Sequence, residues 1–506
     1  MTFRVRPSEA TGTWVALALV TALAAVLRAA GSDRELWWDE VYSLVDSVRR
    51  PLGELLTVFR DDNQHPLYAV LAHLSIGFLG ETPWTFRLPA LLFGVASVPL
   101  LFALGASLTS RREALLSATL LAVSYHHVWF SQNARGYTAL AFWTLLTTLL
   151  LLRLVREPRR RWIAAYAGAA ALGTYTHLTM AFVLASHAVV CALLLVAPAW
   201  LQSERPRAVL SALALAAAAT LALYAPMLGE VRDFFLHRPS TLRGISTPGW
   251  ALRTALGGLQ IGLGTGTGVA AAGVLFACGA ASFLAHRRLA FALFVLPGVL
   301  TLAGTIGVRG TMYPRYLFFL VGFGILLIVR GAFALPGLFA QRRLAVPSRS
   351  PGGAAATVLV ALMILVSALS LARNYRYPKQ DFGGAVRFVE ERRAEGDAVV
   401  TAGVVDYPLR EVYGRRWPSV ESAEQLDELR GRTDRTWLLY TFPRYLEHSS
   451  PRLMEAIRRD CPVVRTFRGT VGGGDVVVCA APAATAERAR PRGAALDDGA
   501  PRSSRS

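Results

Sequence analysis

Lysine is almost missing from this sequence of 506 residues, and acidic side chains are scarce over most of its length. Lys379 is the one lysine, so arginine supplies nearly all of the 53 basic residues, which outnumber the 34 acidic ones. A net charge of +19 would suit a nucleic-acid-binding protein. Because apolar blocks of about 20 residues fill most of the chain, we instead predict a polytopic membrane protein with no nucleic-acid partner. The four cysteines are too few for a disulfide scaffold.

Eleven apolar spans are separated by arginine-rich breaks, and the interior of each span holds no Asp or Glu. A backbone in lipid must satisfy its own hydrogen bonds, so each span is predicted to be a helix. The spans are 11–30, 86–108, 113–130, 138–155, 162–178, 180–200, 208–228, 265–285, 289–308, 315–335 and 353–372. With a cytoplasmic N-terminus, arginines gather in the cytoplasmic loops, as the positive-inside rule requires. We therefore expect a multi-pass protein of the inner (plasma) membrane with an extracytoplasmic C-terminus.

Two regions outside the spans carry patterns of their own. The first outer loop, 31–85, contains helix-like runs at 41–60 and 66–80, which we expect to lie along the membrane surface, and the loop 229–262 is a third such element. Beyond residue 372, helix-like runs alternate with strand-like runs. The helix-like runs are 384–394 and 451–459, and the strand-like runs are 398–401, 437–441, 463–467 and 476–479.

These patterns predict three parts. The membrane domain spans 1–372, a small extracytoplasmic α/β domain spans 373–481, and a disordered tail spans 482–506. Cys461 and Cys479 lie in the α/β domain, where either a disulfide or two buried thiols would fit. The overall fold class is thus an all-α polytopic membrane protein with amphipathic juxtamembrane helices and a small α/β addition.

Carboxylates concentrate in the first outer loop, which holds nine of the 15 acidic residues of the predicted membrane domain. Asp39 and Glu40 follow Trp37 and Trp38, an aromatic pair suited to the headgroup level. A half-desolvated carboxylate in this position can act as a general base. The alternative is a solvated acidic pair that caps the helix starting at Val41.

Candidate phosphate ligands lie at the outer ends of the spans. His65, next to a proline, either bonds a phosphate oxygen or is a surface residue ahead of a helix. Arg135 and Tyr137 lie in the segment SQNARGY, and Arg315 and Tyr316 open the span 315–335. Each arginine either snorkels to the headgroups or binds an anion. Two guanidinium groups facing one cavity would make a phosphate site.

No metal or other cofactor site is predicted with any support from the residues. His126, His127 and His177 lack a compact ligand set with Cys or carboxylate side chains. The sequence therefore offers no ligand cluster that would support a divalent metal.

A series of short motifs resembles the GT-C glycosyltransferases. They are, in chain order, WWDE, HPLY, RLPALLFGV, WFSQNARGYTAL, PRYLFFLVGFG and DFGGAVRFVEE. More narrowly, the chain is similar to the bacterial branch related to protein O-mannosyltransferases and the lipid A aminoarabinose transferase. The similarity covers most of 30–150 and 310–395, and the spans between them match in topology only. It implies transfer of a sugar from a polyprenyl-phosphate donor to an exported hydroxyl acceptor, which is a glycan, a lipid or a protein.

The resemblance also implies roles for individual residues. The acidic residue after the first transmembrane helix is catalytic in that family, and here it is Asp39, with Glu40 beside it. His65 matches the position that approaches the donor phosphate. However, Leu67 replaces a second proline of the O-mannosyltransferases, and the aminoarabinose branch has a lysine in place of His65. We expect an inverting transfer with Asp39 as general base. The expected substrate-binding residues are His65, Arg135, Tyr137, Arg315 and Tyr316.

A transporter or lipid flippase for an anionic or lipid-linked substrate is the alternative class. Transporters often show internal repeats and polar residues at mid-membrane. Here no repeat is evident and the polar residues gather at the outer face, which favours an interfacial enzyme.

Overall fold

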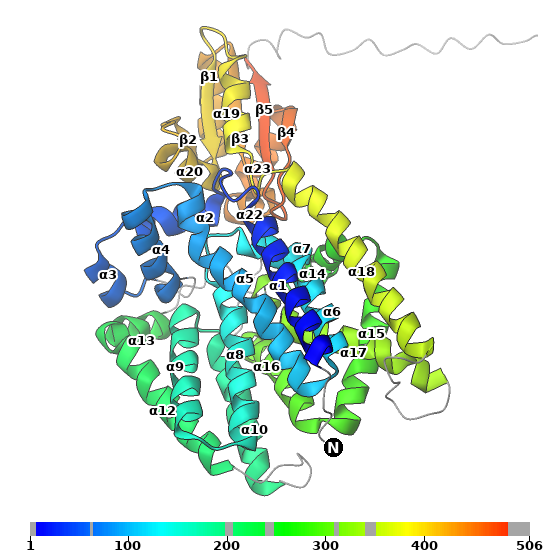
Figure 1. The fold of residues 1–506 in the computed structure, drawn as a ribbon. Coiled ribbons are helices and arrows are strands. Elements are labelled where there is room, and N and C mark those ends of the chain that lie inside the picture. Colours follow the sequence, from blue (N-terminus) through cyan, green and yellow to red (C-terminus); the bar gives the residue numbers. More distant parts are fainter. Residues whose placement is uncertain are drawn as a thin grey trace, which may run out of the picture. The chain divides into compact units, whose positions relative to one another are not determined.

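The computed structural model describes residues 7–60, 64–197, 206–237, 247–307, 313–339 and 351–483. It divides into two compact units, Met1–Pro378 and Lys379–Ser506. The first unit is helical and the second contains a five-stranded sheet (Figure 1). The boundary lies at 378 and not at the predicted 372, because helix α18 (Pro351–Arg376) continues past its apolar part.

Eight helices in the described part of the chain are long and apolar enough to cross a membrane. They are α1 (Pro7–Ala29), α5 (Pro83–Leu108), α8 (Tyr137–Arg156), α12 (Pro206–Tyr224) with its continuation through η2 (Ala225–Met227) and α13 (Leu228–Leu236), α15 (Gly266–His286), α16 (Arg288–Gly307), η3 (Pro314–Leu320) with α17 (Val321–Phe339), and α18. The prediction of a polytopic helical membrane protein is confirmed.

The other three predicted spans are shorter than expected. The span 113–130 is broken into α6 (Arg111–Ala122) and α7 (Tyr125–Ser131), because the Ser124 side chain caps the start of α7. The spans 162–178 and 180–200 correspond to α9 (Arg160–Thr176) and α10 (Met180–Val196), of 17 residues each. Such a helix is about 26 Å long, slightly less than a hydrocarbon core of about 30 Å.

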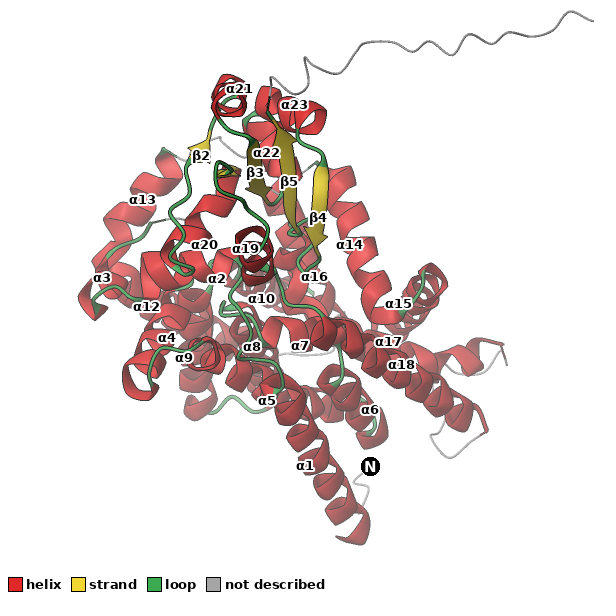
Figure 2. Ribbon diagram, turned by 90° about the horizontal axis from the view of Figure 1, so that it is seen from above, coloured by secondary structure: helices red, strands yellow, loops and turns green. Residues whose placement is uncertain are grey.

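The first outer loop forms short helices. The predicted run 41–60 is divided into α2 (Trp38–Ser43), the π-helical turn η1 (Leu44–Val48) and α3 (Leu52–Thr57), with Pro51 as the break before α3. The run 66–80 is α4 (Pro66–Leu79), which starts with proline at its first position and ends at Gly80, where φ is 85°. In the loop 229–262, α13 is followed by α14 (Pro248–Leu263). Figures 1 and 2 show α3 beside α13, where Phe59 and Phe234 pack edge to face.

Small residues allow the closest helix packing in the membrane unit. A Cβ atom on Gly279 of α15 would lie 1.8 Å from the Leu327 carbonyl oxygen, and one on Gly331 of α17 would lie 1.7 Å from the Leu275 carbonyl oxygen. These backbones therefore touch directly, as small residues permit between membrane helices. The main core of this unit is built around Ala and Leu side chains of α5, α6, α8 and α17.

Arg28, near the end of α1, fixes the position of α7 although it forms no ion pair within the described part of the chain. Its guanidinium is fully buried and donates to the carbonyl oxygens of Leu121 and Ala122, at 3.2 and 3.0 Å, where α6 ends. It also donates to Ser131 Oγ at 3.1 Å and to His127 Nδ1 at 2.7 Å. The C-terminal end of a helix carries partial negative charge, so these carbonyls suit a guanidinium.

The second unit is a small α/β fold with strand order β2-β1-β3-β5-β4. Strand β1 pairs in parallel with β2 and β3, while β5 pairs antiparallel with β3 and β4. The strands are β1 (Ala398–Ala402), β2 (Ser419–Val420), β3 (Arg435–Tyr440), β4 (Val463–Phe467) and β5 (Val476–Pro482). The helices are α19 (Phe382–Glu390), η4 (Gly403–Val405), α20 (Asp406–Glu411), α21 (Ala423–Arg432), α22 (Pro443–Ser449) and α23 (Pro451–Asp460).

The predicted runs of this unit agree closely with its helices and strands. Strand β2 and helices α20 to α22 are additional elements that the sequence patterns did not indicate. Cys461 and Cys479 form a disulfide, with Cα atoms 5.4 Å apart, that links the end of α23 to β5. Of the two alternatives for these cysteines, the bonded one is therefore found. The predicted disordered tail lies outside the described residues, apart from its first two positions.

Candidate active site

The neighbouring acids Asp39 and Glu40 have different surroundings, because consecutive residues of a helix point about 100° apart. The Glu40 carboxylate is fully buried. It accepts from Arg87 Nη2 at 2.5 Å and Nε at 2.8 Å, and from the Ala134 amide at 2.6 Å. It also accepts from the Trp37 amide at 3.3 Å. Glu40 therefore joins α2, α5 and the loop after α7, and its carboxylate is already saturated with donors.

Asp39 faces two of the predicted arginines. Its Oδ2 atom accepts from Arg315 Nη1 at 2.9 Å and lies 3.8 Å from Arg135 Nη1. Arg135 Nη1 also donates to Ser43 Oγ at 3.1 Å. The Asp39 side chain is 11% exposed and that of Arg315 is 25% exposed, so this cluster reaches the surface. Arg135 and Arg315 come from opposite ends of the membrane unit's sequence, and the fold brings both to one carboxylate oxygen.

Some residues of the segment SQNARGY hold the loop in place, and others face the candidate site. The Ser131 hydroxyl accepts from Arg28, and Gln132 Nε2 donates to three carbonyl oxygens at the end of α1. Asn133 Oδ1 accepts from Trp37 Nε1 at 3.1 Å. These contacts hold the loop against α1 and α2. Arg135 is left facing Asp39, and Tyr137 faces a cluster of rings.

The ring cluster contains His65, Tyr137, His177 and Tyr316. The ring centroid of His65 is 4.7 Å from that of His177 and 5.2 Å from that of Tyr137. Those of Tyr137 and Tyr316 are 5.8 and 6.4 Å from that of His177. His177, in the connection between α9 and α10, is the residue of this cluster that the sequence did not select. A Cβ atom on Gly136 would lie 2.8 Å from His65 Nδ1, so only glycine fits there without displacing the ring.

Aromatic rings also hold the arginines in place. The Arg315 guanidinium carbon lies 4.5 Å from the ring centroid of Tyr313 and 5.9 Å from that of Tyr316. The Arg135 guanidinium carbon lies 6.0 Å from the ring centroid of Tyr137. Guanidinium groups at these distances from an aromatic face are attracted to it. Of the predicted substrate-binding residues, all five thus lie around Asp39 or in the adjoining ring cluster.

The electrostatic field in this region is positive. Burial lowers the pKa of the His65 ring well below its usual value, and the charges of Arg135 and Arg315 and the neighbouring His177 lower it further. The Thr176 carbonyl raises this pKa by less than these groups lower it, although it makes no well-formed hydrogen bond to either nitrogen of the His65 ring. His65 is therefore a neutral imidazole at neutral pH until an anion approaches it.

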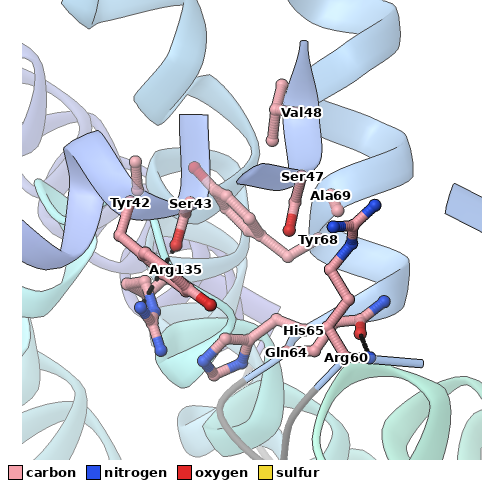
Figure 3. A pocket seen from close by; sticks show the side chains of 11 residues that line it. Tyr42, Ser43, Ser47, Val48, Arg60, Gln64, His65, Tyr68, Ala69 and Arg135 are labelled. Atoms are coloured by element: carbon pink, nitrogen blue, oxygen red, sulfur yellow. Dashed lines mark hydrogen bonds between the residues drawn. The ribbon is translucent and has the colours of Figure 1, made fainter. Parts of the chain in front are cut away.

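A small cleft opens next to this cluster, lined by residues of α2, η1 and α4 and by the loop that holds Arg135. Figure 3 shows the His65 ring beside the Arg135 guanidinium, with Arg60 and Gln64 across from them. Tyr68 and Ser43 line the space between. No group of three or more His, Cys, Asp or Glu side chains suited to a metal ion occurs among the residues that the structure describes.

The fold and this geometry define a polytopic membrane protein with one carboxylate held by two guanidinium groups beside a cleft. Comparison with known proteins adds to this description. A family model described as dolichyl-phosphate-mannose-protein mannosyltransferase matches residues 63–224. No curated protein sequence matches the chain.

Solved structures share the fold at low sequence identity. One is the oligosaccharyltransferase AglB from Archaeoglobus fulgidus, in complex with an inhibitory peptide and a dolichol-phosphate. It is 10% identical, the TM-score is 0.56, and the match covers 93% of this chain and 74% of that one. Another is ArnT from Cupriavidus metallidurans bound to undecaprenyl phosphate, at 14% identity and a TM-score of 0.51, covering 92% of this chain and 98% of that one. The structures show that the chain has the GT-C fold, and the family model matches residues 63–224, less than half of its length. The resemblance found in the sequence is confirmed at this level.

Proposed function

We propose that the protein transfers a sugar from a polyprenyl-phosphate-linked donor to a hydroxyl acceptor, with inversion at the anomeric carbon and Asp39 as general base. The observation that carries this proposal is the position of Asp39 Oδ2, 2.9 Å from Arg315 Nη1 and 3.8 Å from Arg135 Nη1. Two guanidinium groups share one carboxylate. The excess positive charge in a largely buried site suits a phosphate.

The proposed donor class agrees with the location of the site. The family model describes enzymes that use dolichyl-phosphate mannose, and two structures of the same fold hold a polyprenyl phosphate. Nucleotide sugars are cytoplasmic, so a transferase on the outer side needs a donor that the membrane carries. The disulfide between Cys461 and Cys479 supports an extracytoplasmic second unit, because disulfides persist in oxidising compartments. We place the enzyme in the plasma membrane with its N-terminus in the cytoplasm.

The geometry supports a single displacement. Both arginine contacts use Oδ2 of Asp39, which leaves Oδ1 to take the proton from the acceptor hydroxyl. The acceptor oxygen forms a bond to the anomeric carbon as the bond from that carbon to the phosphate oxygen breaks. The electron pair of that bond leaves with the polyprenyl phosphate. Arg135, Arg315 and His65 lie where they would stabilise the charge that grows on the leaving phosphate.

The direct test of the base is Asp39→Asn in purified protein supplied with a labelled lipid-linked sugar. We expect release of polyprenyl phosphate to slow by about 10²–10⁴-fold, the usual contribution of a general base. Asp46→Asn is the matched control, because Asp46 is on the same loop and its ion pair, at 3.8 Å, is with Arg50 and not with an arginine of the site. Turnover of Asp39→Asn equal to that of Asp46→Asn, with both proteins folded, would refute the role of Asp39.

The arginines are tested through donor affinity. Arg135→Ala leaves Asp39 paired with Arg315, so we expect the fold to persist while the KM for the donor rises by at least about 10-fold, the loss of one charge-assisted contact. Arg49→Ala is the control, since Arg49 makes an exposed ion pair with Glu81 at 2.6 Å in the same unit. An unaltered donor KM would mean that Arg135 only reaches toward the headgroups.

A further inference from the structure

We propose that His177 is a further donor-binding residue, a neutral imidazole whose Nε2–H group hydrogen-bonds an anionic oxygen of the donor's phosphate. This inference rests on the proposed function and adds to it a residue from the connection between α9 and α10. His177 is 4% exposed and its ring centroid lies 4.7 Å from that of His65.

The backbone fixes the tautomer of His177. The Thr179 amide donates a hydrogen bond to His177 Nδ1 at 3.0 Å. A backbone N–H can only donate, so Nδ1 is the acceptor, and the neutral ring carries its proton on Nε2. This Nε2–H group is buried and has no hydrogen-bond partner among the described residues. A buried donor without an acceptor is costly, so the group is complementary to an acceptor that the substrate brings.

The groups around His177 are also donors. The Tyr137 hydroxyl and Arg315 Nε are buried without a hydrogen-bond partner in the described structure, and Arg135 and Arg315 both act on the His177 ring through their charge. Among the described residues, the two arginines share the carboxylate of Asp39. Several buried donors close together, two of them on charged guanidinium groups, fit an anion with several oxygens, and a phosphate is such an anion.

His177 and His65 therefore differ in what they contribute. An imidazolium ring donates from both nitrogens, so protonating His177 would break its bond with the Thr179 amide. His177 is thus held as a neutral donor. Neither nitrogen of His65 is bonded in this way, so that ring is free to take a proton when a phosphate approaches.

His187 in α10 provides the matched control. It is also fully buried, its Nδ1 contacts the Tyr166 hydroxyl at 2.8 Å, and its Nε2 also lacks a partner among the described residues. Among the described residues, the charges of Arg135 and Arg315 reach the His177 ring, whereas no arginine charge reaches the His187 ring. Replacing His177 or His187 removes a buried imidazole in either case. A difference in donor affinity between the two variants therefore reports the position of His177 near the arginines.

The experiment measures the affinity of the purified full-length protein for undecaprenyl phosphate in detergent micelles. We expect His177→Phe to weaken binding by about 10- to 100-fold, the range for a hydrogen bond to a charged group, and His187→Phe to leave it unchanged. His177→Gln and His177→Asn separate the two ring positions. A Gln amide reaches the place of Nε2 and an Asn amide that of Nδ1, so we expect Gln to retain most of the affinity and Asn to lose it.

The outcomes distinguish this inference from the proposed function. If the unaltered protein does not bind undecaprenyl phosphate, the proposed donor class is wrong and the role of His177 fails with it. If the unaltered protein binds and His177→Phe binds equally well, the role of His177 fails while the proposed function stands. Should His177→Phe not fold, equal affinities of the Gln and Asn variants would overturn the inference.

Discussion

Glu40→Gln tests whether the second acid of the WWDE segment serves the fold. The Glu40 carboxylate accepts two hydrogen bonds from Arg87 and two from the amides of Trp37 and Ala134. A glutamine keeps the shape, but its NH₂ group faces donors and its neutral head leaves the buried Arg87 without a counter-charge. Removing one partner of a buried ion pair costs about 3–5 kcal/mol.

The other contacts of Arg87 sharpen this prediction. Arg87 also donates to the carbonyl oxygens of Ser32, Arg34 and Glu35, at 2.8, 2.7 and 3.0 Å. Replacing both partners, by Glu40→Leu with Arg87→Met, removes the unpaired charge but leaves these three carbonyls without their donor. We therefore expect the double variant to regain only part of the lost stability, although buried pairs elsewhere are often replaced without cost.

The assay is thermal unfolding in detergent micelles, followed by the loss of the monodisperse protein peak. With about 2.1 cal/mol/K of unfolding entropy per residue over a membrane unit that ends at Pro378, the loss lowers the midpoint by roughly 5 °C. Glu54→Gln is the control, because Glu54 is on the same loop with a side chain that is 43% exposed, and its ion pairs with Arg50 and Arg60 are each worth less than about 1 kcal/mol. Equal midpoints for the two variants would refute a structural role for Glu40.

Three further predictions concern the ring cluster and the second unit. Gly136→Ala pushes a methyl group against His65, so donor turnover should fall several-fold, whereas Gly168→Ala, which has open space, should change nothing; equal activities would contradict the tight packing. In the folded protein, burial and the nearby arginines lower the pKa of His65 well below its value in the unfolded chain, about 6.5. As the pH falls below about 6.5, the unfolded chain therefore takes up a proton that the folded protein does not, and the stability of the fold decreases. The loss is about 1.4 kcal/mol per pH unit, and His65→Gln should flatten the slope of the unfolding midpoint between pH 7 and 5. Replacing Cys461 and Cys479 by alanine should destabilise the second unit by about 3 kcal/mol, seen as faster proteolysis there than in the rest of the chain.

Hydrophobic runs predicted the helices of this fold well, because a helix in lipid needs only an apolar stretch of sufficient length. What the runs could not show is where an apolar stretch is interrupted. Ser124 breaks one predicted span by capping α7, and a serine within an apolar run carries no signal that distinguishes a cap from a packed hydroxyl. In the second unit, alternating patterns located four strands, but the two-residue strand β2 is too short to leave a pattern.

The site was predicted in part, for reasons that particular residues show. Asp39 and the two arginines were found because charged side chains at the ends of apolar spans need an explanation. Glu40 was assigned with Asp39, since adjacent letters do not reveal that their side chains diverge. Arg87, an arginine inside the apolar span 86–108, was the available signal that a buried carboxylate had to pair with it. His177 was considered only as a metal ligand, because its neighbours in the candidate site come from distant segments of the chain.

Arginine serves two purposes in the membrane unit, and the kind of partner around each guanidinium separates them. Arg28 is saturated by carbonyl oxygens and neutral side chains, and Arg87 by Glu40 and three loop carbonyls. Arg330 of α17 has its own carboxylate, that of Glu113 at 3.2 Å. Arg135 and Arg315 instead share the single carboxylate of Asp39. Two buried guanidinium groups on one carboxylate can accommodate a further anion, and the proposed role of both arginines as phosphate ligands rests on this arrangement.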